Sequence, residues 1–118
     1  AGMNRETFLI VQIETAEAVE RVDELLSVPG VDAALIGPTD LSLALGVPAQ
    51  NEHPKLVAAI EKTMAACAAH GVVPAIHTND TQMTAAWARR GMRLVSIGSE
   101  AGHLVAGASQ AVKTIRGE

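Results

Sequence analysis

Residues 35–42 have the sequence Leu-Ile-Gly-Pro-Thr-Asp-Leu-Ser, and this stretch decides how the rest of the chain is interpreted. An apolar run over residues 33–36 stops at a Gly-Pro turn, and a carboxylate follows at Asp40. The pattern predicts a buried strand with Asp40 just past its carboxyl end. Glu14 follows the earlier apolar run of residues 9–13 in the same way. Because parallel α/β folds bind ligands at the carboxyl ends of their strands, the two acids predict a site there.

Strands and helices are predicted to alternate along the whole chain. Apolar runs predict strands over residues 8–13, 31–36, 72–76 and 92–97, the first of them covered on both faces. Helical spacing predicts helices over residues 16–27, 53–70, 80–90 and 100–115, and a short helix over residues 40–45. This alternation indicates a parallel sheet with right-handed crossovers. The expected fold class is therefore α/β, with four βα units.

The length of the chain restricts the architectures that four such units can form. An eight-unit barrel needs about 250 residues, and this chain has 118. A small open sheet would fit the length, but both of its edges would be bare. A half-barrel over residues 1–118 that is completed by another half is the alternative.

Composition excludes several classes of function. Aromatic residues make up 2% of the chain and the formal net charge is −4, with no basic run, so we expect no nucleic-acid partner. No apolar stretch approaches the roughly 18–20 residues of a membrane span, and no signal-peptide layout is present, so a soluble cytoplasmic protein is expected. Cys67 is the single cysteine and lies in an Ala-rich pattern. It is interpreted as a small buried helical residue rather than a nucleophile.

A series of motifs extends along nearly the whole chain. They are Val11-Gln12-Ile13-Glu14-Thr15, Val28-Pro29-Gly30-Val31-Asp32, Ile36-Gly37-Pro38-Thr39-Asp40-Leu41-Ser42, Leu45-Gly46, His53-Pro54, His70-Gly71, Ala75-Ile76-His77 and Val95-Ser96-Ile97-Gly98-Ser99. Together they resemble the HpcH/HpaI aldolase family of class II pyruvate aldolases, which includes 4-hydroxy-2-oxoheptanedioate aldolase. The family fold is a TIM (β/α)8 barrel. The resemblance implies that this chain is its C-terminal half, strands five to eight.

The resemblance also implies a divalent-metal site. In the family, the Glu of the first motif and the Asp of the Gly-Pro-x-Asp-Leu-Ser motif bind the ion, and these are Glu14 and Asp40 here. The metal is usually Mg²⁺ or Mn²⁺, with Co²⁺ as a further option, and hard oxygen ligands favour such ions. It binds the carboxylate and keto oxygens of pyruvate and stabilises the pyruvate enolate.

Further residues are expected to contact the substrate. Backbone amides around Thr39, at a helix start, suit the pyruvate carboxylate, and Gln12 is implied to lie near the water shell of the metal. His77 is predicted at a strand end that faces the same site. The expected substrate-binding set is Gln12, Gly37, Pro38, Thr39 and His77.

The implied reaction is cleavage of a 4-hydroxy-2-oxo acid to pyruvate and an aldehyde, which is carbon–carbon lyase chemistry. The general-base His and the pyruvate-binding Arg of the family lie in its N-terminal half, and no residue here matches either motif. No catalytic residue is therefore assigned, and the isolated chain is expected to be inactive or nearly so. The expected partner is a second copy, as a homo-oligomer, or a complementary N-terminal half-barrel.

Other interpretations stay open beside this one. The chain is alternatively a relative of the citrate lyase β-subunit and malyl-CoA lyase group, or a non-catalytic half-barrel that associates with itself. Several side chains have simpler structural roles as alternatives. Asp40 would cap a helix, His77 would bond to loop backbone, His53 and His70 would be structural helix-end residues, His103 would face solvent or a partner, and Gly98 would serve turn geometry rather than phosphate binding.

Overall fold

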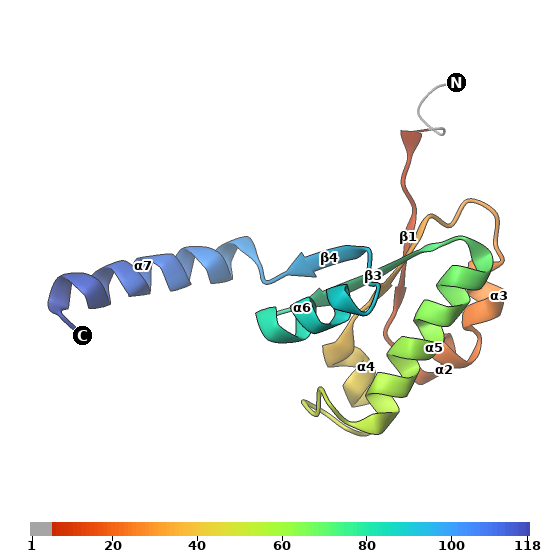
Figure 1. Cartoon of the computed structure of the whole chain (residues 1–118), viewed down its shortest axis with the longest axis horizontal. Coiled ribbons are helices and arrows are strands. Elements are labelled where there is room, and N and C mark those ends of the chain that lie inside the picture. Colours follow the sequence, from red (N-terminus) through yellow and green to blue (C-terminus); the bar gives the residue numbers. More distant parts are fainter. Residues whose placement is uncertain (1–5) are drawn as a thin grey trace.

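The structure is a computed structural model that describes residues 6–118. Four strands form one sheet in the order β1-β2-β3-β4, with every neighbouring pair parallel. Their bounds are β1 (Ile10–Ile13), β2 (Ala33–Ile36), β3 (Val73–Thr78) and β4 (Leu94–Ile97). Helices connect successive strands (Figure 1). The α/β prediction with four βα units is confirmed.

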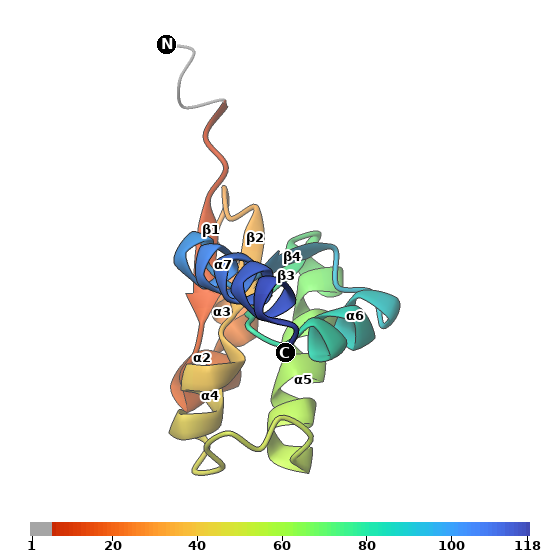
Figure 2. The same cartoon turned by 90° about the vertical axis from the view of Figure 1, so that its left-hand side faces the viewer.

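Each strand is followed by one or two helices. They are α2 (Ala16–Glu20) and α3 (Val22–Leu26) after β1, α4 (Pro38–Ala44) and α5 (Pro54–His70) after β2, α6 (Thr81–Arg89) after β3, and α7 (Glu100–Arg116) after β4. The helices α2 to α6 pack near the sheet, whereas α7 extends away from it (Figure 1). Figure 2 views the molecule from the side toward which α7 extends, so that α7 lies in front of the sheet. Among residues 6–118, no helix has the length and apolar character that crossing a membrane requires.

One face of the sheet, called the outer face, carries the helices and the core. Ile13, Ile36 and Ile76 form one row across β1, β2 and β3, and none of the three is exposed. They belong to one cluster with helical side chains, among them Val19, Val22, Leu26, Leu56, Ile60, Cys67 and Trp87. Burying an aliphatic side chain of this size stabilises a protein by about 1.5–3 kcal/mol. This cluster is therefore the main source of stability in the chain.

The opposite face of the sheet, called the inner face, holds the alternate residues of each strand. By register it comprises Ile10, Gln12, Ala33, Leu35, Val73, Ala75, His77, Leu94 and Ser96. Ile10 on the edge strand β1 is 42% exposed, and Gln12 is exposed too. The prediction that the first strand is covered on both faces is therefore wrong for this chain. That strand also begins at Ile10 rather than at Phe8.

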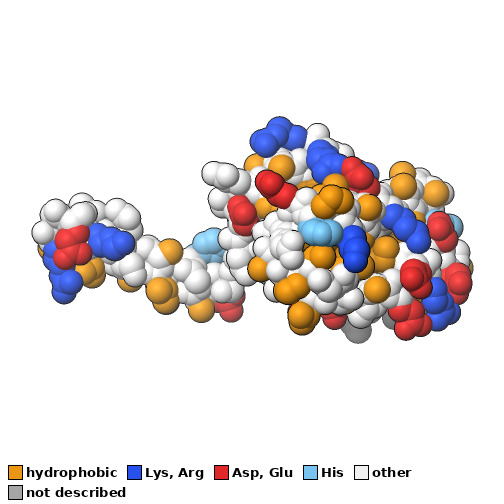
Figure 3. Space-filling view, turned by 90° about the horizontal axis from the view of Figure 1, so that it is seen from below, with side chains coloured by type: hydrophobic (Ala, Val, Ile, Leu, Met, Phe, Trp, Pro, Cys, Tyr) orange, Lys and Arg blue, Asp and Glu red, His pale blue; other side chains and the backbone are white. Residues whose placement is uncertain are grey.

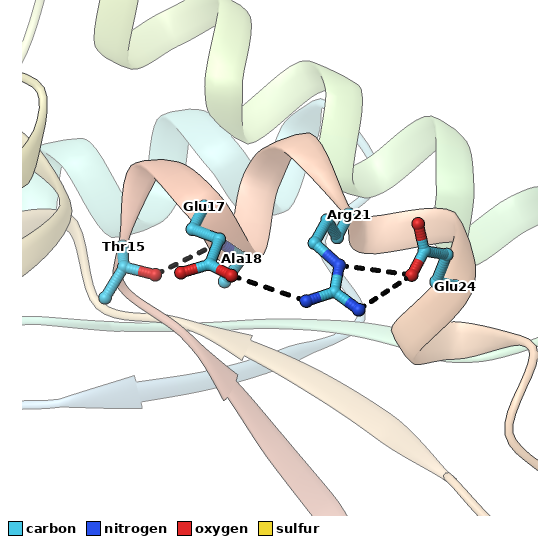
Figure 4. Close-up of polar contacts among 5 residues, drawn as sticks. All are labelled: Thr15, Glu17, Ala18, Arg21 and Glu24. Atoms are coloured by element: carbon cyan, nitrogen blue, oxygen red, sulfur yellow. Dashed lines mark hydrogen bonds and ion pairs between the residues drawn. The ribbon is translucent and has the colours of Figure 1, made fainter.

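The predicted single helix over residues 16–27 is also wrong, because the chain breaks at Arg21 with φ −100° and ψ 20°. Thr15 begins α2, and its hydroxyl accepts a hydrogen bond from the Ala18 N–H at 3.1 Å. Arg21 donates to Glu24 Oε2 at 2.9 and 3.1 Å and to Glu17 Oε1 at 3.3 Å (Figure 4). The carboxylates of Glu24 and Glu17 raise the pKa of the Arg21 guanidinium. The apolar spacing could not reveal the break, because the spacing is helical both before and after Arg21.

Helix α5 matches its predicted span. The His53 Nδ1 accepts a hydrogen bond from the Lys55 N–H at 3.1 Å, and Gly71 ends the helix with φ +69°. Cys67 is buried as predicted, and desolvation raises the pKa of its thiol to about 11. Ala68, which the spacing places inward, is exposed instead.

Four further boundaries differ from the predicted ones. Helix α4 begins at Pro38 rather than at Asp40, because Pro38 occupies the first helical position. Strand β3 continues to Thr78, so His77 lies within the strand rather than after it. Strands β2 and β4 each begin two residues later than predicted, at Ala33 and Leu94.

Candidate metal centre

The two predicted metal ligands lie at the same edge of the sheet. Glu14 directly follows β1, and Gly37 directly follows β2. Ile13 lies opposite Ile36, and the Gly37 N–H donates to the Ile13 carbonyl at 3.3 Å, which joins the two strand ends. Asp40 is the third residue of α4, in its first turn. The sheet thus brings the two carboxylates to one carboxyl-terminal edge, as the sequence predicts.

Glu14 is held by a neighbour on its own strand. Gln12 donates from Nε2 to Glu14 Oε2 at 2.6 Å. A Cβ atom at Gly37 would lie 3.5 Å from Gln12 Nε2 and 3.6 Å from Glu14 Oε2. Gly37 therefore packs close to the side chains of Gln12 and Glu14, so that a Cβ atom there would be in van der Waals contact with both. Gln12 orients one carboxylate oxygen and leaves the other, Oε1, without a hydrogen bond from residues 6–118.

Asp40 does not have the capping role that was its structural alternative. The N-cap of α4 is Gly37, and no side chain caps this helix. The exposed Asp40 carboxylate accepts no hydrogen bond from the described residues. Its place in the first helical turn favours a negative charge through the helix dipole. The Asp40 carboxylate is thus open to a cation.

The donor set fits a hard divalent cation. Within residues 6–118, no three or more His, Cys, Asp and Glu side chains lie together as a complete metal cluster. The chain offers two carboxylates at one edge of the sheet, and hard cations such as Mg²⁺ bind one or two carboxylates and keep positions for water and substrate. A thiolate or imidazole cluster of the kind that zinc prefers is not formed in this part of the molecule.

The start of α4 forms the floor beside the two acids. Pro38 is buried and has no N–H, so it can contribute shape but no hydrogen bond. The amides of Thr39 and Asp40 have no intrahelical acceptor, as in the first turn of any helix. The Thr39 carbonyl accepts a hydrogen bond from the Ser42 hydroxyl at 2.8 Å. This contact fixes the first turn that carries Asp40.

His77 lies on the inner face of β3, directly opposite Ser96 of β4. Its Nδ1 is 3.0 Å from Ser96 Oγ, so its partner is a strand side chain and not loop backbone. Continuing the register by one residue past Ile13, Ile36, Ile76 and Val95 gives one row across the sheet, here called the carboxyl-edge row: Glu14, Gly37, His77 and Ser96. Adjacent strands lie about 4.8 Å apart, which places the backbone of His77 about 10 Å from that of Glu14. The printed partners of Glu14 and His77 are Gln12 and Ser96, and the spacing of their strands would let both side chains contact one small molecule held at this edge.

The other three histidines are engaged outside this row. His53 caps α5, and His70 Nε2 lies 3.1 Å from Asp23 Oδ1. His103 Nε2 lies 3.1 Å from the Ile97 carbonyl oxygen. The structural interpretation of His53 and His70 is confirmed.

Two features of the site were missed from the sequence. One is the Gln12–Glu14 hydrogen bond, and the other is Ser96 as the partner of His77. A signal for both exists, because Gln12 and Ser96 are the polar residues within two otherwise largely apolar strands. Polar residues at such positions mark the face that the core does not use.

The hollows of the surface lie elsewhere. One of about 470 Å³ lies between the loop before α5 and helix α6, on the helical side of the sheet. It is lined by Asn51, Val57, Asp80, Met83, Trp87 and Arg90, and the Arg90 guanidinium stacks 4.0 Å above the Trp87 ring. Neither acid of the carboxyl edge borders it. Within the described residues, the two acids therefore lie on an open edge and not in an enclosed cavity.

Comparison with known proteins finds one family over most of this sequence. The sequence model described as HpcH/HpaI aldolase/citrate lyase matches residues 1–107. A hydroxypyruvate/pyruvate aldolase from Sagittula stellata is 37% identical over 94 residues, which are 80% of this chain and 37% of the relative. The 4-hydroxy-2-oxo-heptane-1,7-dioate aldolase of Escherichia coli is 35% identical over 95 residues, 80% of this chain and 36% of the relative.

Solved structures agree with these sequence relatives. The crystal structure of an HpcH/HpaI aldolase from Desulfitobacterium hafniense DCB-2 superposes with a TM-score of 0.85 at 37% identity. The match covers 96% of this chain and 44% of that protein. The chain thus spans less than half the length of the relatives it matches, as one part of a TIM barrel.

Proposed function

This chain belongs to the HpcH/HpaI aldolase/citrate lyase family, and we propose that it forms the metal-binding part of a carbon–carbon lyase barrel. The proposed reaction cleaves a 4-hydroxy-2-oxo acid to pyruvate and an aldehyde. The observation that carries the proposal is the pair Glu14 and Asp40, which follow neighbouring strands at one edge of the sheet. The names of the similar aldolases support the reaction class.

Glu14 and Asp40 are the proposed ligands of the cation, with Mg²⁺ or Mn²⁺ as the expected ions and Co²⁺ as a further option. When bound, the cation would draw electron density from the carbonyl and carboxylate oxygens of a 2-oxo acid, which favours cleavage of the carbon–carbon bond. Gln12 acts as a positioning residue, because its amide holds one oxygen of Glu14.

The remaining residues of the predicted set are proposed to bind substrate. Gly37 and Pro38 shape the floor, and the free amide of Thr39 suits a carboxylate oxygen. His77 lies in the carboxyl-edge row about 10 Å from Glu14 by strand spacing, so we assign it to the aldehyde-derived part of the substrate. Its Nδ1 is fixed by Ser96, and its Nε2 has no partner among the described residues.

The chain by itself is proposed to lack activity. His53, His70 and His103 are engaged away from the carboxyl-edge row, so none of them can serve there as general base. No residue of the described chain packs over the Glu14 and Asp40 carboxylates from the side away from β1 and β2. The match to strands five to eight of the barrel, with a complementary N-terminal half supplying the base, stays a prediction.

The test is Mn²⁺ binding to this chain, followed by the paramagnetic spectrum of the ion. We expect the wild type to bind and the double variant Glu14→Gln with Asp40→Asn to lose binding. The matched control is Glu17→Gln with Asp23→Asn, which removes two exposed acids outside the edge and should leave binding unchanged. Absence of binding by the wild type, or binding that survives the first double variant, overturns the assignment of the ligands.

A further inference from the structure

Among the four histidines of this chain, His77 is the one whose hydrogen-bond partner is a hydroxyl. Histidine side chains reach the surface among hydrophobic and charged ones in the space-filling view (Figure 3). His53 and His103 contact backbone groups, and His70 contacts a carboxylate. His77 contacts Ser96 through Nδ1 at 3.0 Å, on the inner face of the sheet. Because a hydroxyl can donate or accept, it can determine which ring nitrogen of His77 carries the proton.

His77 and Ser96 lie in the same carboxyl-edge row as the proposed metal ligand Glu14. Gly37 is the one member of the row between Glu14 and His77, and it carries no side chain. His77 is partly buried, and Ser96 is exposed on the edge strand β4. Nε2 of His77 has no partner among residues 6–118. This nitrogen is therefore the group that His77 would offer to a small molecule held at this edge.

The hydrogen bond between Ser96 and His77 can run in two directions. If the Nδ1–H donates to Ser96 Oγ, the serine proton has no acceptor and Nε2 has no donor among the described residues. If Ser96 donates to an unprotonated Nδ1, the serine proton and Nδ1 are paired, and the Nε2–H is the one donor left without a partner. The second arrangement leaves fewer polar groups unpaired. It corresponds to the neutral tautomer of His77 in which Nε2 carries the proton.

We infer that Ser96 is a positioning residue that makes His77 a hydrogen-bond donor, and that this pair selects substrates whose aldehyde-derived part carries an oxygen acceptor. The inference rests on the proposed function, because it names the substrate class of that same site. A carboxylate or hydroxyl oxygen beyond C4 of a 4-hydroxy-2-oxo acid would accept from the Nε2–H. An alkyl group there would remove water from the same N–H without offering an acceptor, which disfavours its binding. A site that donates a hydrogen bond to its ligand discriminates against an analogue without the acceptor.

The first test measures the tautomer of His77 in the metal-free chain. Nitrogen-15 chemical shifts distinguish a protonated from an unprotonated ring nitrogen, and a His77→Gln variant assigns the signals. At about pH 8.5, well above the ordinary imidazole pKa of about 6.5, we expect a proton on Nε2 and none on Nδ1. Ser96→Ala should give a mixture of the two tautomers, and Ser96→Thr, which keeps a hydroxyl, should restore the wild-type spectrum.

Ser27→Ala is the matched control, because the Ser27 hydroxyl donates to the Glu24 carbonyl and lies outside the carboxyl-edge row. It should leave the His77 signals unchanged. Ser96 is exposed, so its substitution should not unfold the chain. A proton on Nδ1 in the wild type, or signals that Ser96→Ala leaves unchanged, overturns the role of Ser96.

The second test compares three ligands in the presence of Mg²⁺, with the same signals as the measure of binding. The ligand 4,5-dihydroxy-2-oxopentanoate ends in a hydroxyl, and 4-hydroxy-2-oxohexanoate has a methyl group in the same place. The third ligand, 4-hydroxy-2-oxoglutarate, ends in a carboxylate. We expect the two ligands with a terminal oxygen to shift the Nε2 signal and to bind roughly tenfold more tightly than the alkyl ligand. Ser96→Ala should reduce this difference.

Equal affinities for the three ligands, or no shift of the Nε2 signal with any of them, overturn the proposed substrate class. The tighter of the two oxygen-bearing ligands identifies the acceptor as a carboxylate or a hydroxyl. Failure of the proposed function is seen separately, as absence of Mn²⁺ binding by the wild type. The substrate class would then fall with it, whereas the tautomer of His77 is measured without metal and decides the role of Ser96 on its own.

Discussion

The chain contains two regions that follow the same sequence rules and differ in packing. From β1 to α6, each strand is followed by a helix that packs on the outer face, and the row of Ile13, Ile36 and Ile76 is fully buried. From β4 to α7, the strand and the helix have equally regular patterns, but Val95 and the whole of α7 stay exposed. The comparison teaches that periodicity predicts which side of an element is apolar, and not whether that side is covered within this chain.

The largest expected effect is the loss of stability on truncating a residue of the buried row, compared with truncating Val95 at the exposed end of that row. Ile76→Ala should lower the free energy of unfolding by about 2–5 kcal/mol, because it leaves a cavity among fully buried neighbours. Val95→Ala should cost about 1 kcal/mol or less in dilute solution, where its side chain is partly in water. Urea unfolding followed by circular dichroism measures both. Equal costs for the two variants in dilute solution would contradict the division into a packed body and an uncovered terminal unit.

The next largest effect concerns the thiol in the body. Desolvation raises the pKa of Cys67 from 9.0 to about 11, so the folded state keeps a proton that the unfolded state loses. The stability from this difference is present below pH 9 and is lost as the pH rises from 9 to 11, by about 3 kcal/mol at most. Unfolding by urea at a series of pH values measures the slope.

Cys67→Ala is the control for this pH dependence. It removes the titrating group, so the fall in stability between pH 9 and pH 11 should become smaller than in the wild type. An unchanged slope in this variant would show that other groups cause the alkaline loss.

Much of this architecture follows from local sequence signals. Gly71 and Pro54 fix the ends of α5, and Asp80 caps α6 through hydrogen bonds from the Gln82 and Met83 amides at 2.8 and 3.1 Å. The two acids at the strand ends were predicted for the same reason, since Glu14 and Asp40 directly follow recognisable strand and turn patterns. These features depend on residues that are close in sequence.

What the sequence did not predict depends on contacts between distant segments. The pairing of His77 with Ser96 requires the register between β3 and β4, which no local pattern specifies. The exposure of Ile10 and Val95 depends on whether another segment packs over the strand that carries each of them. The break at Arg21 has no local signal, since buried apolar residues continue at helical spacing from α2 into α3.

The smallest expected effects come from removing the N-terminal cap of α6, in the packed body, and that of α7, in the exposed terminal unit. Asp80→Ala should lower the free energy of unfolding by about 1 kcal/mol, because α6 is packed on the body and loses its N-terminal cap. Ser99→Ala removes the corresponding cap of α7, whose hydroxyl accepts from the Gly102 N–H. Its cost should appear as reduced helix content at the α7 start and not as a shift in the urea midpoint of the body, since α7 buries nothing there. Amide hydrogen exchange distinguishes local fraying of α7 from destabilisation of the body. In Ser99→Ala, we expect faster exchange only in the first turns of α7. A shift in the urea midpoint for Ser99→Ala as large as that for Asp80→Ala would mean that α7 and the body unfold as one unit. In dilute solution, that result would contradict the independent unfolding of α7 and the body, on which the comparison depends.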